Sequence, residues 1–225
     1  DYISTHHYES PNNFATGPSR DEEFYRELKQ IIDDGPNPGI QVYCSEWNAQ
    51  STDWRTGLYC GGILNVFERC GEFFKLGGPA LFLRHVSASA WDNAFINFDH
   101  RTWFPAPNYV VMKLWRDHYA PHRIAVTGDS GKLNVVATRT DSGKTVYLKA
   151  VNPSQESINV EIQVAGQAIT SSTLRQVAPG SLAARNTLAE RDVVRVEVGE
   201  IELVDQTVRF TLPPMSCGVA TMECE

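Results

Sequence analysis

The hydrophobic pattern of this chain changes its period near residue 121. Before that point, short apolar stretches alternate with segments whose apolar residues recur every three or four positions, as in strands followed by helices. After it, strand-like stretches of alternating apolar and polar residues are separated by turn residues, as at Asp141-Ser142-Gly143-Lys144. The first pattern is typical of βα units with a parallel sheet, and the second of an antiparallel β-sandwich. We therefore expect an α/β part over residues 1–121 and an all-β part over residues 122–225.

Each part contains a set of candidate elements. In the α/β part we expect strands at residues 2–4, 40–44 and 80–86. The capping-box pair Ser19 and Glu22 predicts the start of a first helix, and two more should begin near Asp53 and at Pro107. The first helix should face inward with the apolar residues that recur at helical spacing: Phe24, Leu28, Ile31 and Ile32. The strands expected in the all-β part are residues 133–139, 145–151, 158–164, 193–201, 208–212 and 218–222.

The composition limits what this chain can bind. With 42% hydrophobic and 21% charged residues among 225, it has the make-up of a globular protein with a sizeable core. Its net charge of -7 and the lack of a Lys/Arg run argue against a nucleic-acid partner. No apolar stretch approaches the ~20 residues needed to span a bilayer, so we expect no membrane partner. The five cysteines are not spaced like zinc ligands, and we expect free thiols, no metal and no cofactor.

The run Val42-Tyr43-Cys44-Ser45-Glu46-Trp47-Asn48 contains the most informative carboxylate of the chain. A short apolar stretch ends there in an acid, although a buried carboxylate costs several kcal/mol unless it is paired. Enzymes built on (β/α) barrels keep their reacting groups at the carboxyl ends of parallel strands. Glu46 is therefore a candidate catalytic residue. On the heptapeptide alone, a solvated glutamate just past a strand remains the alternative.

Several blocks of sequence, in order, carry a family resemblance. In the first part they are Asp1-Tyr2-Ile3-Ser4 with His6 and Tyr8, then Ser45-Glu46-Trp47-Asn48, then Trp91-Asp92-Asn93-Ala94-Phe95-Ile96-Asn97-Phe98-Asp99 with Pro107, Tyr109 and Val110. In the second part they are Ala150-Val151-Asn152, Arg185-Asn186-Thr187 and Leu212-Pro213-Pro214 with Ser216. Together they resemble the C-terminal portion of retaining α-L-arabinofuranosidases of glycoside hydrolase family 51. The resemblance implies strands six to eight of a (β/α)8 TIM barrel, followed by an antiparallel β-sandwich.

The resemblance also implies roles for individual residues. Glu46 would be the catalytic nucleophile, since a retaining glycosidase forms a glycosyl-enzyme ester on a carboxylate. Tyr8 would donate a hydrogen bond to that carboxylate, and His6, on the same strand end, would line the sugar pocket. Trp91 would form a wall of the pocket, and Asn48 would serve substrate binding by orienting the loop. Without the resemblance, His6 and His7 would be interpreted as part of a polar loop after a strand.

The second carboxylate of a retaining mechanism is not evident. The two carboxyl groups must lie ~5–5.5 Å apart, and the family keeps its acid/base in an Asn-Glu pair that does not occur in this sequence. Three parallel strands also cannot close a barrel. We therefore expect the acid/base glutamate to come from a missing N-terminal barrel half, in the same or another chain. The expected substrate is a plant cell-wall oligo- or polysaccharide, arabinan or arabinoxylan, from which the enzyme would remove α-L-arabinofuranosyl units. The sequence leaves open whether the protein forms a homo-oligomer.

Two other functions remain as alternatives. An endo-β-1,4-glucanase or xylanase would use the same barrel and the same mechanism, with an open cleft in place of a pocket. Gln50 supports this alternative, because many family members carry an aromatic residue at that position, four residues after the nucleophile. A non-catalytic carbohydrate-binding or interaction module would place the function in residues 122–225. Tyr147 and Phe210 are the only aromatic residues there, which argues against a row of stacking side chains.

Overall fold

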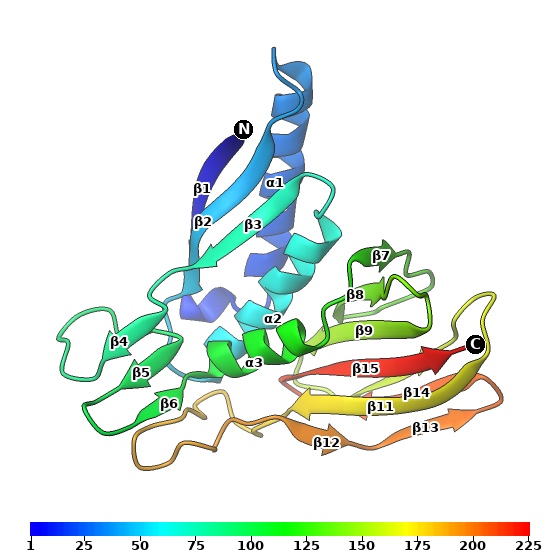
Figure 1. The fold of residues 1–225 in the computed structure, drawn as a ribbon. Helices are drawn as coiled ribbons and strands as arrows, with labels where there is room; N and C mark the ends of the chain where they lie inside the picture. The colour runs from blue at the N-terminus through cyan, green and yellow to red at the C-terminus, as the bar shows by residue number, and fades with distance from the viewer.

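The computed structural model describes residues 1–225, and its first part is built on a parallel three-stranded sheet (Figure 1). The strands β1 (Tyr2–Glu9), β2 (Gln41–Ala49) and β3 (Phe74–Pro79) lie in the order β1-β2-β3. Helix α1 (Gly17–Asp34) connects the first two strands, and α2 (Trp54–Arg69) connects the last two. Parallel neighbours need such crossovers, because a tight turn would reverse the chain direction. The carboxyl ends of all three strands consequently lie at one edge of the sheet.

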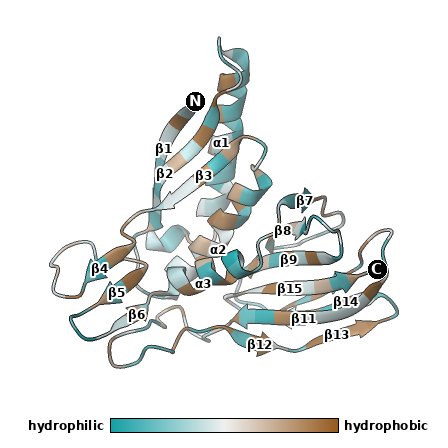
Figure 2. Cartoon of the chain, in the orientation of Figure 1, coloured by the Kyte–Doolittle hydropathy of each residue, from teal (hydrophilic) through white to brown (hydrophobic).

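Both helices cover one face of this sheet with aromatic side chains. The ring centroid of Tyr25 in α1 lies 5.0 Å from that of Phe74 in β3. Phe67 of α2 stacks on Phe74 at 4.1 Å and meets Trp47 of β2 edge-on at 5.7 Å. Figure 2 shows α1 as mainly hydrophilic with hydrophobic residues in between, as expected for a helix with one face on a sheet. The opposite face of the sheet has no helix against it.

A small sheet and a third helix follow the parallel sheet. Strands β4 (Leu83–His85) and β5 (Ile96–Phe98) pair in parallel, and β6 (Trp103–Pro105) pairs antiparallel with β5. Helix α3 (Pro107–Asp117) then leads toward the second part and begins with the expected proline. A 3-10 helix (Pro11–Asn13) precedes α1. No helix combines the length and apolar character required to cross a membrane.

The second part is a sandwich of two antiparallel sheets. Its larger sheet has six strands in the order β12-β11-β15-β9-β8-β7, and its smaller sheet has the order β10-β14-β13. The strands are β7 (His122–Ile124), β8 (Asn134–Arg139), β9 (Thr145–Asn152), β10 (Ile158–Ile162), β11 (Ile169–Val177), β12 (Glu197–Gly199), β13 (Ile201–Val204), β14 (Thr207–Leu212) and β15 (Ser216–Cys224). The expected hairpin between β8 and β9 is present.

The two parts share a hydrophobic core. One buried cluster lies inside the sandwich, but the larger cluster joins α2 and α3 to sandwich strands through Val151, Val177, Cys217 and Val219. All five cysteines are free and buried, as expected. We propose a division into 1–121 and 122–225 because β7 begins at His122 and pairs with β8. That division stays a prediction.

Several expected strands differ from the observed ones. The first two are longer than predicted, since β1 runs to Glu9 and β2 to Ala49. The strand expected at residues 80–86 is present only as the short β4 of the small sheet. The third strand of the parallel sheet is β3, which was not predicted because its Lys75-Leu76-Gly77-Gly78 sequence has little strand propensity. The single strand expected at 193–201 is wrong, and that region contributes only β12 and the start of β13. The polar, β-branched sequence of β11 went unpredicted.

The start and the buried face of α1 also differ from expectation. The helix begins at Gly17, with Pro18 in its first turn and no side-chain cap, so Ser19 and Glu22 do not form a capping box. Of the four apolar residues predicted to face inward, Phe24 and Ile31 are exposed. Tyr25 and Ile32 are the buried residues at that level of the helix.

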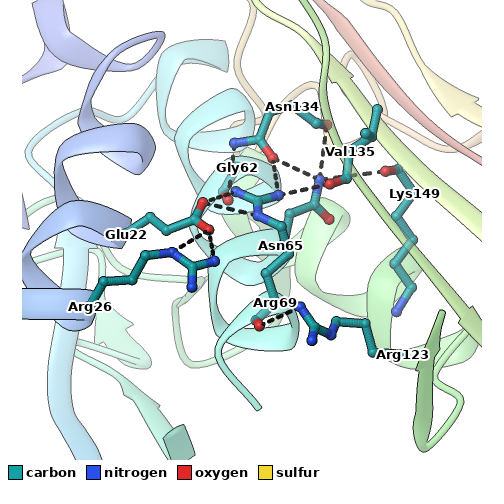
Figure 3. A network of polar contacts seen from close by, with 9 residues as sticks. All are labelled: Glu22, Arg26, Gly62, Asn65, Arg69, Arg123, Asn134, Val135 and Lys149. Atoms are coloured by element: carbon teal, nitrogen blue, oxygen red, sulfur yellow. Dashed lines mark hydrogen bonds and ion pairs between the residues drawn. The ribbon is translucent and has the colours of Figure 1, made fainter. Parts of the chain in front are cut away.

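Instead of capping the helix, Glu22 begins a polar network that reaches the sandwich (Figure 3). Its Oε2 accepts from Arg69 Nε at 2.9 Å, and its Oε1 accepts from Arg26 Nη2 at 2.6 Å. Arg69 Nη1 donates to Asn134 Oδ1 at 2.9 Å and to the Val135 carbonyl at 2.8 Å. The network therefore connects α1, α2 and β8. Although burial alone would raise it, these hydrogen bonds hold the pKa of Glu22 below its usual value.

We predict that Glu22→Gln lowers the free energy of unfolding at neutral pH and makes it depend less on pH in the acid range. A carboxyl whose pKa is lowered on folding stabilises the protein above its unfolded pKa, near 4.5, and that stabilisation is lost as the pH falls through the folded value. The free energy of unfolding should fall by about 1–3 kcal/mol at pH 7, because hydrogen bonds to a charged group are lost. Urea unfolding between pH 3 and pH 8 measures both effects.

Glu161→Gln is the matched control, because Glu161 forms an exposed ion pair with Arg209 at 2.9 Å. It should change the free energy of unfolding by less than about 1 kcal/mol. Equal losses in the two variants would contradict a stabilising role for the Glu22 network.

Candidate active site

Three predicted residues meet on the face of the sheet that no helix covers. Tyr8 and His6 are two positions apart on β1 and therefore point to the same side. The Tyr8 hydroxyl donates to Oε2 of Glu46 on β2. His6 Nδ1 lies 3.5 Å from the same oxygen. The side chains of His6 and Glu46 are 55% and 45% exposed, so the carboxylate is reachable from solvent.

The environment of Tyr8 keeps its hydroxyl protonated. Partial burial, followed by the hydrogen bond to Glu46 and the charge of that group, raises the pKa of Tyr8 to about 12. At neutral pH the phenol is therefore the donor and the carboxylate the acceptor. Tyr8 and His6 both contact Oε2 of Glu46, whereas its Oε1 has no hydrogen-bond partner within the protein.

His7 points to the opposite face and belongs to a separate cluster. Its Nδ1 lies 2.8 Å from Oδ1 of Asp21 in α1, and Tyr59 of α2 donates to Oδ2 of the same carboxylate at 2.9 Å. Tyr59 and Asp21 are buried. The cluster fastens β1 to both helices. The alternation of side chains along β1 separates His7 from His6, which the expectation of a short strand ending at Ser4 did not resolve.

Asn48 holds the loops around the site. Its Nδ2 donates to the carbonyls of Ala80 and Asn93 at 3.0 and 2.9 Å. Its Oδ1 accepts from the Ala49 amide at 2.9 Å and from Asn108 Nδ2 at 3.3 Å. With 1% exposure and its hydrogen-bonding capacity filled, Asn48 has no free group for a sugar. The structure therefore supports the loop-orienting role of Asn48 and argues against direct substrate contact.

Of the three tryptophans Trp47, Trp54 and Trp91, one is exposed and two lie in the core. Trp91 is 59% exposed, and its ring centroid lies 6.3 Å from that of Tyr8. Its φ of 59° is unusual for a bulky residue and indicates a locally constrained loop. Trp47 and Trp54 are buried, and Trp54 Nε1 donates to the Met215 carbonyl at 2.6 Å. Only Trp91 of the three is available for stacking on a ligand.

Two polar contacts near the site were not predicted. Ser45, next to Glu46, has its Oγ 2.6 Å from Oγ of Ser4 on β1. Glu9, at the end of β1, accepts from Asn13 Nδ2 at 2.9 Å and from Arg20 at 2.5 Å. Although burial opposes it, these donors lower the pKa of Glu9. The pairing of Ser4 with Ser45 depends on strand register, which sequence alone does not give.

No second carboxylate makes a hydrogen bond or ion pair with Tyr8 or His6, the partners of Glu46. Asp53 accepts from the Arg55 amide at 3.1 Å and caps α2. Asp99 accepts from the amides of Arg101 and Thr102 at 2.8 and 2.7 Å. The side-chain carboxylate of Glu46 has Tyr8 and His6 as its partners. No group of three or more His, Cys, Asp or Glu side chains is placed to hold a metal ion.

Comparison with known proteins gives a consistent family match. The family model described as α-L-arabinofuranosidase C-terminal domain matches residues 40–216. An extracellular exo-α-L-arabinofuranosidase of Streptomyces chartreusis is 26% identical over 131 residues, covering 56% of this chain and 14% of that protein. The resemblance to the C-terminal portion of α-L-arabinofuranosidases is thereby confirmed.

Solved structures of similar fold extend over nearly the whole chain. A thermostable family 51 α-L-arabinofuranosidase from Thermotoga petrophila has a TM-score of 0.84 and 20% identity, covering 99% of this chain and 53% of that structure. The α-L-arabinofuranosidase of Thermotoga maritima, solved as an arabinose complex, has a TM-score of 0.85 and 19% identity, and the match covers 99% of this chain and 52% of that structure. These matches confirm the expected fold class, the last part of a (β/α)8 barrel followed by a β-sandwich. The chain spans about half the length of these structures.

We predict that Asn48→Ala destabilises the protein by about 1–3 kcal/mol, because the Ala80 and Asn93 carbonyls would lose buried donors. Asn37→Ala, at an exposed position on the loop between α1 and β2, should stay within about 0.5 kcal/mol of the parent. Chemical denaturation of both variants measures the difference. An Asn48 variant as stable as the Asn37 variant would mean that the amide does not hold these loops.

Proposed function

Because this chain belongs to the family of the α-L-arabinofuranosidase C-terminal domain, we propose that it carries the nucleophile of a retaining glycoside hydrolase. The complete protein would remove α-L-arabinofuranosyl units from arabinan or arabinoxylan. The hydrogen bond from Tyr8 to Oε2 of Glu46 is the observation that carries this proposal. It fixes a solvent-reachable carboxylate at the end of a parallel strand, where barrel enzymes perform their chemistry.

The two oxygens of Glu46 suit a double displacement. Oε2 is held by Tyr8 and lies near His6, whereas Oε1 has no protein partner. In the first step Oε1 would attack the anomeric carbon while an acid protonates the leaving-group oxygen, and a glycosyl-enzyme ester forms. In the second step water, deprotonated by the same group, would attack the anomeric carbon and release Glu46 as a carboxylate. Tyr8 would keep Oε2 in place through both steps.

The residues around Glu46 suit a small terminal sugar. Trp91 offers an exposed indole beside Tyr8, and His6 offers ring nitrogens for hydroxyl groups. We propose that these two side chains contact the substrate and that Asn48 acts on it indirectly, by holding the loops. The sugar and the linkage cleaved in the complete protein belong to this proposal.

We propose that the acid/base carboxylate lies outside residues 1–225. Two observations support this. Asp53 and Asp99 accept hydrogen bonds from backbone amides in their own loops. In addition, β1 is an edge strand, and near it Tyr2, Phe24 and Ile31 expose apolar side chains. An exposed strand edge flanked by apolar residues suits the pairing of a further barrel segment, in the same or another chain.

The structure favours this proposal over the two alternatives. An endo-acting glucanase or xylanase would need several aromatic side chains along an open cleft, but Trp47 and Trp54 are buried. The exposed Trp103 packs on Tyr109, which leaves Trp91 beside Tyr8. A carbohydrate-binding module would need exposed aromatics on the sandwich. Phe210 is buried there, and Tyr147 packs against His118 with ring centroids 5.5 Å apart.

We predict that Glu46→Gln in the complete protein lowers hydrolysis of an aryl α-L-arabinofuranoside by at least ~10³-fold, because the amide cannot form the glycosyl-enzyme ester. The fold should be retained, since Glu46 is half exposed and makes no core contact. Adding azide to Glu46→Gly should restore turnover and yield a glycosyl azide. Glu23→Gln, an exposed position on α1, is the control and should keep full activity.

Two results would argue against the assignment. Activity of Glu46→Gln within tenfold of the parent, ~1.4 kcal/mol, would exclude Glu46 as the nucleophile. Cleavage of aryl β-cellobioside or β-xylobioside in preference to the arabinofuranoside would instead support the endo-acting alternative.

We expect Tyr8→Phe to act more mildly, lowering kcat about tenfold with an intact fold, because one hydrogen bond to the carboxylate is lost. Steady-state kinetics on the same substrate measure this. Unchanged kinetics would show that Tyr8 does not support the nucleophile.

A further inference from the structure

Strand β2 contains a bulge at the candidate nucleophile. Along β1, Thr5 pairs with Cys44 but His6 pairs with Glu46, so Ser45 is skipped. Along β3, Gly77 pairs with Cys44 and Pro79 pairs with Trp47. Two residues of β2, Ser45 and Glu46, therefore stand opposite Gly78 alone. Since both neighbours slip at the same place, the irregularity belongs to β2, and we call Ser45–Glu46 the β2 bulge.

The β2 bulge changes which side chains face the helices. In a regular strand Cys44 and Trp47, three positions apart, would point to opposite faces. Here both are buried on the helix side, where Trp47 packs on Phe67. The extra residue leaves Glu46 on the open face, within reach of Tyr8 and His6. Bulges often re-aim a side chain in this way next to active sites.

Two hydrogen bonds hold the backbone of the bulge. The buried Cys44 thiol donates to the Glu46 carbonyl, with Sγ 3.3 Å from the oxygen. On the other side, Ser45 Oγ lies 2.6 Å from Ser4 Oγ, which ties the extra residue to β1. Each contact acts within one residue of the Glu46 side chain.

The other neighbour of β2, strand β3, leaves room for the bulge only at Gly78. A Cβ at position 78 would lie 2.8 Å from the Ser45 carbonyl oxygen, a backbone atom that cannot rotate away. At the adjacent Gly77, on the other face of β3, a Cβ would instead meet the Phe67 ring at 2.9 Å. Both positions are crowded, but a side chain at 78 presses on the bulge whereas one at 77 presses on the helix layer.

We propose that Gly78 is a positioning residue for Glu46, because its missing side chain lets the β2 bulge form and aim the carboxylate. This inference rests on the proposed function. It adds that the geometry of the nucleophile is set by a glycine on the neighbouring strand, which touches neither substrate nor carboxylate.

The test compares Gly78→Ala with Gly77→Ala in the complete protein. We expect both variants to lower the unfolding temperature. Gly78→Ala should also lower kcat on an aryl α-L-arabinofuranoside at least tenfold, with KM changed less than threefold, since misplacing a reacting group by a fraction of an ångström slows chemistry more than binding. Gly77→Ala should keep kcat, per folded molecule, within twofold of the parent.

Ser4 provides a second pair of variants in case Gly78→Ala does not fold. Ser4→Ala removes the tie to Ser45 without crowding and should lower kcat about threefold, whereas Ser4→Thr keeps the hydroxyl and should restore it. Equal kcat in the two glycine variants would overturn this inference but not the proposed function. If Gly78→Ala does not fold, a parent-like kcat in Ser4→Ala would have the same meaning. An active Glu46→Gln variant would overturn the proposed function and this inference with it.

Discussion

The close approach of α2 to its neighbours on both sides determines how the rest of this structure is assembled. A Cβ on Gly62 would lie 2.5 Å from Pro18 of α1, and a Cβ on Gly61 would lie 2.9 Å from Val151 of β9. Two adjacent glycines cost helix stability, ~1 kcal/mol each. Because these glycines have no side chains, the backbone of α2 packs directly against α1 on one side and against the sandwich on the other. The parallel sheet, with Glu46 at its end, is thereby held at a fixed position relative to the sandwich.

Polar contacts then select one orientation of this packing. Lys149, fully buried on β9, binds Glu68 of α2, and burial raises the pKa of Glu68 and lowers that of Lys149 against their mutual attraction. Such a pair adds little net stability, because desolvation offsets the attraction. We infer that this pair fixes the orientation of α2 against the sandwich, together with the hydrogen bond from Trp115 Nε1 to Asn65 Oδ1 at 2.8 Å. Apolar surfaces alone would permit several arrangements of helix against sheet.

The sequence predicted the architecture and the contact between Tyr8 and Glu46 better than it predicted the surroundings of that pair. The family resemblance implied that Tyr8 contacts Glu46, and the two side chains do meet, because neighbouring parallel strands end at a common edge. The β2 bulge could not be predicted, since one inserted residue leaves no trace in hydrophobic alternation over so short a strand. Strand β3 was missed because Phe73 continues the helical period of α2 and Gly77-Gly78 lacks strand propensity. Glu22 was misassigned because its partner, Arg69, is distant in sequence.

The shared core also bears on how such a chain can change during evolution. Val151 belongs to the sandwich but fills the space above Gly61, and Cys217 and Val219 of β15 belong to the same buried cluster as α2 and α3. A sandwich taken from a distant relative would bring its own side chains to this junction and meet a helix surface shaped for others. The two parts are therefore not interchangeable modules. Residues on the two sides of the junction should vary in step among relatives, and recombination should succeed more readily within either part than at the boundary between them.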